Sequence, residues 1–314
     1  MVSVREMGGN LMTLNFPTDG HAAYETIHTT DPTAHSRLDQ IASAGFQYVL
    51  NYTLIYDHAS DMISYINYAY SIGLKVIVAL NSTVIWRDSV TNSNAIQTTF
   101  PRMYADSGNQ NTDTGFTTYI VNQVKNLPGL WGYYLADEVV SADHANVLTH
   151  ANAVKAADPN HPRLIIEAAS AFTTSACFNN TSLMYDCCDV IGDDFYPVGD
   201  PSGYGTLTTA QIASGIQNYC NLHSLDSAIA IQTFSWSAYG RPGQPWPTQA
   251  QMMQFRNDAM SNMFPRLILW YSYFDIANPA NNAPALEWTY VRQALQGHSE
   301  IVMFPSAVRR GLRR

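Results

Sequence analysis

Strand-like and helix-like segments alternate along the whole chain. Eight short runs are rich in apolar, β-branched or aromatic residues, as expected of buried strands. These runs lie at 8–16, 46–53, 74–81, 130–138, 163–170, 189–197, 228–236 and 267–275. Segments with helical periodicity lie between them, at 33–44, 58–72, 114–127, 144–157, 208–222 and 248–263. Nearly continuous apolar strands separated by helices indicate a parallel sheet that is covered on both faces.

Eight strands fit a closed barrel better than an open doubly wound sheet. An open sheet of this kind commonly binds a nucleotide, but neither G-x-G-x-x-G nor G-x-x-x-x-G-K-[ST] occurs in the chain. Hydrophobic residues make up 46% of the sequence and charged residues 13%, which provides for a large core and argues against disorder. We therefore predict an α/β fold with a single (β/α)8 TIM barrel over residues 1–305 and a basic tail over 306–314.

Charge and composition limit the partners and the location of the protein. The net charge of -9 argues against nucleic acid as a partner, because phosphate binding requires clustered Lys and Arg. No apolar run approaches the length that spans a membrane. The low lysine content and the many Asn, Ser, Thr and Tyr residues favour a secreted protein whose leader precedes this numbering, with a cytoplasmic protein as the alternative. We expect a monomer that uses no cofactor and no metal.

Four cysteines lie within one segment of the chain, at Cys177, Cys187, Cys188 and Cys220. Their spacing matches no zinc-binding pattern. Because the adjacent Cys187 and Cys188 are poorly placed to bridge each other, two of the three possible pairings remain. We predict two disulfides within this set, which would also support secretion. The alternative is that the four are buried free thiols.

Polar and aromatic residues gather where the predicted strands end. In a barrel the carboxyl ends of all strands meet on one face, which carries the active site. Amides and carboxylates bind sugar hydroxyls, and flat rings stack on the apolar faces of pyranoses, so this face is predicted to bind carbohydrate. The predicted substrate-binding residues are Asn51, Asn81, Tyr134, Tyr196, Trp236, Trp246, Trp270, Tyr273 and Asp275.

The fourth predicted strand, "LWGYYLADE", ends in two adjacent carboxylates, Asp137 and Glu138. If Glu138 points into the barrel, strand alternation places Gly132, Tyr134 and Ala136 on the same side. The large Trp131, Tyr133 and Leu135 would then face the helices. This arrangement carries Glu138 to the rim, where partial burial would raise its pKa towards that of a proton donor. The alternative is that the two carboxylates cap the following helix.

The segments "WGYYLADE", "ADPNHP", "DVIGDDFYP" and "IQTFSW" resemble those of the clan A barrel glycoside hydrolases. Within that clan, the chain is most similar to uncharacterised glycosidase-like proteins with a "GYYLADE" fourth strand. The resemblance implies that Glu138 is the catalytic acid/base. It also places Asp137 where the clan commonly has an Asn that binds the sugar 2-hydroxyl.

The resemblance fails at the seventh strand, where the clan has a glutamate nucleophile and this chain has Gln232. A neutral amide cannot form the glycosyl-enzyme ester. Either another carboxylate acts, or the protein binds sugars without catalysis, or a nucleophile has been substituted. Asp194 is the leading second carboxylate because it shares a strand face with Gly192 and Tyr196. Glu167 and Asp275 are further candidates.

The predicted function is hydrolysis of glycosidic bonds in a poly- or oligosaccharide, with Glu138 as general acid and Asp194 as base or nucleophile. Long loops at 82–108 and 241–249 would flank a cleft on the active face. Two alternatives stay open. One is a non-catalytic carbohydrate-binding barrel. The other is a metal-dependent barrel hydrolase, which would need histidines and carboxylates that converge on that face.

Overall fold

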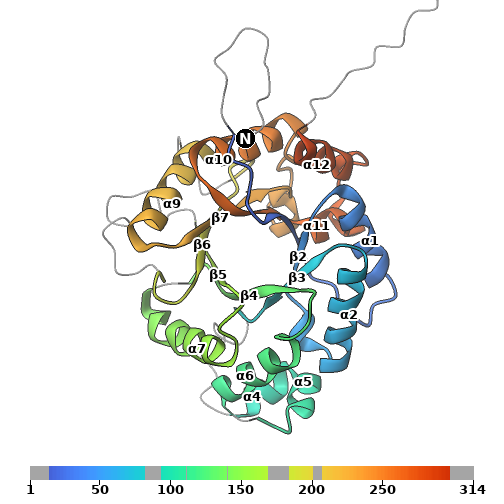
Figure 1. Ribbon diagram of the computed structural model, residues 1–314. Coiled ribbons are helices and arrows are strands. Elements are labelled where there is room, and N and C mark those ends of the chain that lie inside the picture. The colour runs from blue at the N-terminus through green and yellow to red at the C-terminus, as the bar shows by residue number, and fades with distance from the viewer. Residues whose placement is uncertain are drawn as a thin grey trace, which may run out of the picture.

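The computed structural model describes residues 14–81, 93–110, 112–139, 141–168, 184–200 and 207–297. Within these ranges eight parallel strands form one closed barrel in the order β1 to β8, with helices outside it (Figure 1). The strands are β1 (Gly20–Glu25), β2 (Tyr48–Asn51), β3 (Lys75–Ala79), β4 (Leu130–Asp137), β5 (Arg163–Ala168), β6 (Val190–Phe195), β7 (Asp226–Gln232) and β8 (Pro265–Tyr271). The predicted (β/α)8 barrel is confirmed.

The six predicted helices are present with ends that differ by no more than three residues. They are α1 (Ala34–Ala44), α2 (Ala59–Ser71), α6 (Asp113–Val124), α7 (His144–Ala157), α9 (Thr209–His223) and α10 (Gln249–Asn262). The helices α9 and α10 each begin with a capping box, formed by Thr208 with Gln211 and by Thr248 with Gln251. In these motifs the threonine and glutamine side chains satisfy backbone N–H groups that the first helical turn leaves unpaired.

Within the described residues, four further helices were not predicted from the sequence. They are α4 (Ser93–Thr99), α5 (Pro101–Asp106), α11 (Tyr273–Ala277) and α12 (Glu287–Gln296). The first barrel strand was also misplaced: β1 lies at 20–25, whereas it was predicted at 8–16, of which residues 8–13 lie outside the described ranges. Its sequence, "GHAAYE", lacks the long aliphatic side chains that mark the other strands. The predicted tail at 306–314 lies outside the described residues.

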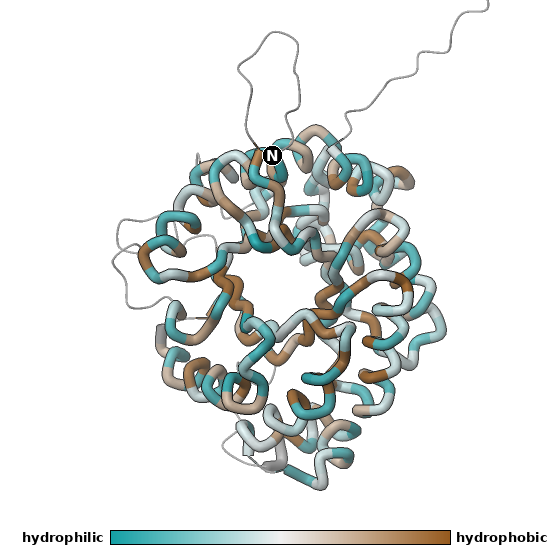
Figure 2. Tube along the Cα trace, viewed as in Figure 1, coloured by the Kyte–Doolittle hydropathy of each residue, from teal (hydrophilic) through white to brown (hydrophobic). Residues whose placement is uncertain are grey.

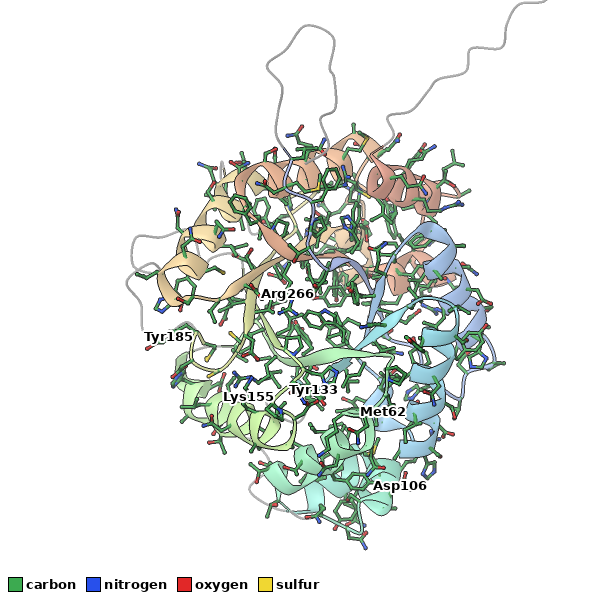
Figure 3. All side chains as sticks on the ribbon, viewed as in Figure 1. Met62, Asp106, Tyr133, Lys155, Tyr185 and Arg266 are labelled. Atoms are coloured by element: carbon green, nitrogen blue, oxygen red, sulfur yellow. The ribbon has the colours of Figure 1, made fainter. Side chains whose placement is uncertain are left out.

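Each strand divides its side chains between the barrel interior and the helix layer. In β8, Leu267 and Leu269 join an interior cluster, whereas Ile268 and Trp270 pack with the helices. Apolar residues are concentrated on the strands, and the outer surfaces of the helices are more polar (Figure 2). Side chains fill the space enclosed by the ribbons (Figure 3). The interior is therefore a packed core, which leaves only the barrel ends for a binding site.

Strand β4 departs from simple alternation. Its register shifts against β3 between Val76 and Ile77, and against β5 between Tyr134 and Ala136. Tyr134 lies inside the barrel and Tyr133 outside, as predicted, but Trp131 lies inside and Ala136 outside. An irregularity in pairing changes which face a residue occupies, so the prediction for these two residues was wrong.

The predicted disulfides are not formed. Cys187, Cys188 and Cys220 are buried free thiols, and Cys177 lies outside the described residues. Burial raises the pKa of all three described thiols, so they pack as small apolar side chains.

The part of the chain that the structure describes contains no helix long and apolar enough to span a membrane.

One buried carboxyl belongs to a barrel strand but faces the helix layer and not the space inside the barrel. Glu167, in β5, pairs in register with Asp193 of β6 and is 2% exposed. Its Oε1 atom has no hydrogen-bond partner within the described ranges. Burial raises the pKa of Glu167 to about 8, against the effect of a hydrogen bond from the Met184 backbone. The folded protein therefore favours the protonated form of this group.

We predict that Glu167→Gln stabilises the protein at high pH. A carboxyl whose pKa is higher in the folded state stabilises the protein when protonated, and this contribution is lost as the pH rises through about 8. At pH 9 the variant should exceed the parent in unfolding free energy by roughly a few kcal/mol, because glutamine carries no charge to desolvate. Denaturant unfolding at pH 5 and pH 9 measures the difference. An equal effect at both pH values would contradict the account.

Candidate active site

A pocket opens at the carboxyl ends of strands β4, β6, β7 and β8. It encloses about 540 Å³ of empty space, including the part that is open to solvent. Its lining consists of three acidic and five aromatic residues: Asp137, Glu138, Asp194, Tyr196, Phe234, Trp236, Tyr239 and Tyr271. The pocket therefore lies on the face where a (β/α)8 barrel carries its active site.

Glu138 stands at the rim of the pocket in an unusual backbone conformation. It follows the last residue of β4 and has a φ of 48°, in the left-handed region that few residues other than glycine adopt. Its backbone N–H donates to the carbonyl of Ile166 at 2.9 Å. This hydrogen bond fixes the turn that ends β4, and the exposed Glu138 side chain lines the pocket.

Asp194 comes from β6 and shares a hydrogen bond with the Glu138 carboxyl. It is 5% exposed, and its Oδ1 atom has no hydrogen-bond partner among the described residues. Burial raises the pKa of Asp194 well above its usual range, and the nearby charges of Glu138 and Asp193 raise it further. Two carboxyls in contact cannot both be charged at low cost, so this pair holds one proton, with Asp194 as the protonated partner.

Asp137 is held by two tyrosines. The hydroxyl of Tyr134 donates to one carboxylate oxygen at 2.6 Å, and the hydroxyl of Tyr52 donates to the other at 3.1 Å. Burial raises the pKa of Asp137 to about 6, and the Glu138 charge adds to the effect, whereas the two hydroxyl donors lower it. Asp137 is thus a fixed carboxylate that is ionised above about pH 6.

Five aromatic rings line the pocket together with the carboxyls. The ring of Phe234 lies edge-on to those of Tyr196, Trp236, Tyr239 and Tyr271, with centroids 5.1–5.4 Å apart. The Tyr239 hydroxyl lies 3.0 Å from that of Tyr271 and donates to Asp275 at 2.9 Å. These contacts join the rings into one aromatic wall of the pocket.

The structure brings five of the predicted site residues to the pocket: Asp137, Glu138, Asp194, Tyr196 and Trp236. Others support it from behind. Tyr134 is fully buried and positions Asp137, and Asp275 accepts a hydrogen bond from Tyr239. Trp246 packs against the interior cluster that underlies the pocket.

Gln232 does not line the pocket. It is fully buried, and its side-chain amide bonds only to backbone. Its Oε1 accepts from the Val198 N–H at 2.8 Å, and its Nε2 donates to the carbonyls of Val198 and Phe234 at 2.9 and 3.0 Å. The prediction of a catalytic position for Gln232 is corrected, because its amide joins β7 to the segment that follows β6.

Four predicted substrate-binding residues lie elsewhere. Asn51 is fully buried and bonds to Ile27 and Thr53, and Asn81 does not contribute to the pocket lining. Trp270 faces the helix layer, where its Nε1 donates to His21 at 3.1 Å. Tyr273 lies in α11 and donates to Gln40 of α1 at 2.8 Å. The turn from β8 into α11 removes Tyr273 from the strand phase on which its prediction depended.

Four residues of the site were not predicted: Tyr52, Phe234, Tyr239 and Tyr271. A usable signal existed for Tyr271. It follows Leu267 and Leu269 at the strand period, so it continues their interior-facing phase to the rim. Tyr239 lies in a short 3-10 turn beyond β7, and Tyr52 follows β2, where the strand period no longer applies.

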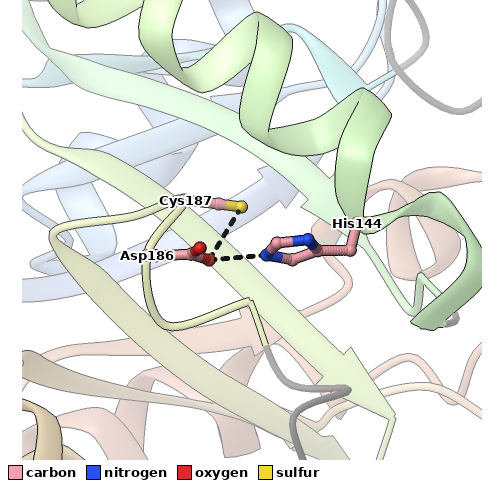
Figure 4. A group of neighbouring side chains, drawn as sticks. All are labelled: His144, Asp186 and Cys187. Atoms are coloured by element: carbon pink, nitrogen blue, oxygen red, sulfur yellow. Dashed lines mark hydrogen bonds and ion pairs between the residues drawn. The ribbon is translucent and has the colours of Figure 1, made fainter.

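One group of potential metal ligands occurs among the described residues, in the helix layer (Figure 4). The donor atoms of His144, Asp186 and Cys187 lie within 4.8 Å of one another. His144 Nε2 pairs with Asp186 at 2.7 Å, and the Cys187 thiol donates to the same oxygen at 3.4 Å. The set of donors suits Zn²⁺, but these contacts also serve to join α7 to the segment before β6. None of the three residues lines the pocket.

Comparison with known proteins identifies the fold. No protein-family model and no curated protein matches the sequence. Among solved structures, a family 5, subfamily 18 glycoside hydrolase of Streptomyces cattleya in complex with GlcNAc has a TM-score of 0.59 at 13% identity, covering 90% of this chain and 80% of that one. An endoglucanase of Pseudomonas stutzeri has a TM-score of 0.59 at 12% identity, covering 89% of this chain and 95% of that one. A family 10 xylanase of Thermobacillus composti has a TM-score of 0.55 at 12% identity, covering 88% of this chain and 97% of that one.

We predict that Tyr134→Phe raises the pKa of Asp137. The hydroxyl of Tyr134 stabilises the ionised carboxylate, and its loss should move the pKa upward from about 6 by roughly one to two pH units. Carboxyl ¹³C NMR of aspartate-labelled protein measures the titration. Tyr133→Phe is the matched control, because it removes a hydroxyl that donates at 2.7 Å to Asp158, away from the pocket. An Asp137 titration that is unchanged in Tyr134→Phe would refute the assignment.

Proposed function

We propose that the protein is a glycoside hydrolase that acts on a poly- or oligosaccharide. The observation that carries this proposal is the carboxyl pair of Glu138 and Asp194, which holds one proton beside a wall of aromatic rings. Such a pocket combines a proton donor with surfaces on which sugar rings can stack. The similar solved structures include several glycoside hydrolases, one of them in complex with GlcNAc, which supports a carbohydrate substrate.

The pair acts as the general acid in this proposal. The Glu138 and Asp194 side chains are in hydrogen-bond contact, whereas the two carboxyls that flank a scissile bond stand about 5 Å or more apart. The two groups are therefore on the same side of the substrate. Asp194 stores the proton, and the more exposed Glu138 meets the glycosidic oxygen. This assignment keeps Glu138 as the donor but replaces the role of base that the sequence favoured for Asp194.

Asp137 is the second carboxylate of the proposed mechanism. Its two tyrosine donors fix its orientation and favour its ionised form near neutral pH. It accepts a proton from water as the water oxygen attacks the anomeric carbon. The bond from that carbon to the leaving oxygen breaks, and the leaving oxygen takes the proton of the Glu138–Asp194 pair. Proton exchange with solvent then restores both sites.

A second candidate function is carbohydrate binding without hydrolysis. It is favoured by Gln232, because the seventh strand ends in an amide that is occupied by backbone hydrogen bonds. Such a protein would keep the aromatic wall without needing the shared proton.

Secretion stays a prediction that rests on composition, since the expected support from disulfides is missing.

We predict that Glu138→Gln, Asp194→Asn and Asp137→Asn each reduce kcat/KM by about 10²–10⁴, the usual contribution of one acid or base. The substrate is first found by screening the parent protein against a panel of polysaccharides. Circular dichroism then checks that each variant is folded. Asp258→Asn is the matched control, because Asp258 lies near the end of α10, away from the pocket lining.

The outcomes separate the two functions. Activity that survives all three pocket substitutions would rule out the proposed mechanism. A protein that binds a polysaccharide in the panel but cleaves none, and whose binding survives Asp194→Asn, would instead be a carbohydrate-binding barrel.

A further inference from the structure

We propose that the pocket selects a sugar that carries a free, positively charged amino group. The inference deepens the proposed function, since it rests on carbohydrate binding at the same site. It is carried by the lining of the pocket, in which carboxyls and aromatic rings meet without a basic side chain in the described part of the chain. That combination suits an ammonium group better than a hydroxyl or a carboxylate.

The acidic side of the pocket lacks an internal counterion. Asp137, Glu138 and Asp194 converge there, and even with one proton shared by the last two, the group retains negative charge at neutral pH. Salt bridges satisfy other carboxylates of the barrel: Arg37 pairs with Glu25 at 2.7 Å, and Arg163 pairs with Asp189 at 2.9 Å. No such partner serves the pocket carboxyls among the described residues. A cationic ligand would supply the missing charge.

Asp194 offers a specific contact for such a ligand. Its Oδ1 atom is buried and without a hydrogen-bond partner in the described ranges, yet the residue lines the pocket. A buried acceptor without a donor is costly, and an entering N–H group would remove that cost. Because an ammonium group carries three donors, one amine can bond the Asp194 and Glu138 carboxyls together.

The aromatic side of the pocket favours a cation for a second reason. The faces of Trp, Tyr and Phe rings attract positive charge, most strongly where water is excluded. The wall already makes one such contact with the protein itself: the guanidinium of Arg241, beyond the lining residues, lies 5.0 Å from the centre of the Trp236 ring. The rings of Tyr196, Phe234 and Tyr271 line the same pocket as the carboxyls.

The test compares sugars that differ only in whether one carbon carries an ammonium group or a hydroxyl. Calorimetry at pH 6, where a sugar amine is protonated, measures binding of three pairs: glucosamine with glucose, galactosamine with galactose, and mannosamine with mannose. Three configurations are used so that the comparison does not depend on the orientation of one hydroxyl. We expect the amine to bind at least tenfold more tightly in one pair or more. Glu138→Gln should reduce that preference to below threefold, whereas Asp258→Asn should leave it unchanged.

A ratio below threefold in every pair, or no detectable binding of any amino sugar, would overturn the inference. So would a preference that survives Glu138→Gln. These failures differ from a failure of the proposed function. Cleavage of a neutral polysaccharide that depends on Glu138 would leave the hydrolase intact without the amine preference. Selective binding of an amino sugar without cleavage of any glycoside would leave the preference intact without the hydrolase.

Discussion

The contact between Asp194 and Glu138 determines what this pocket can do. A carboxylate in the place of Asp194 loses water on nearly all sides and meets a second acid within hydrogen-bond reach. The least costly solution is one proton held between the two groups, with the negative charge on the partner that is open to solvent. The rest of the site follows from this condition. Because the carboxyl pair supplies both the proton and the negative charge, the aromatic rings contribute only apolar surface. Asp137 depends on the two tyrosine hydroxyls to remain an oriented carboxylate.

The packed interior of the barrel explains why these groups gather at one end. Leu50, Ile77, Leu164, Leu267 and Leu269 belong to the cluster that fills the space inside the strands. Close approach is required there, as a Cβ atom on Gly192 would lie 2.5 Å from the carbonyl oxygen of Ala228. The acidic groups of the site accordingly stand at the ends of strands, at Asp137, Glu138 and Asp194. The same barrel at 12–13% identity in several glycoside hydrolases shows that the scaffold tolerates very different sequences.

The sequence predicted the scaffold better than the site, for physical reasons. Strand and helix periods depend on neighbouring residues, so the barrel and six of its helices could be predicted directly from the sequence. The alternation along β6 placed Asp194 on the same strand face as Gly192. Strand alternation predicts the wrong face where strand pairing is irregular, and the two register shifts of β4 brought Trp131 into the barrel interior. It also fails where a strand has ended. Tyr273 and Tyr239 both follow a strand, yet only Tyr239 reaches the pocket. The burial of Gln232 depends on Val198, which is 34 residues away in the chain and adjacent only after folding.

The protonation state of Asp194 tests the central claim most directly. Carboxyl ¹³C NMR of aspartate-labelled protein reports it without interference from the glutamates, and loss of a resonance in Asp194→Asn assigns the signal. The account predicts that the pKa of Asp194 lies well above that of an ordinary aspartate and that Glu138→Gln lowers it, because the neighbouring charge is removed. An Asp194 that is fully ionised at pH 5, or that titrates identically with and without Glu138, would contradict the account.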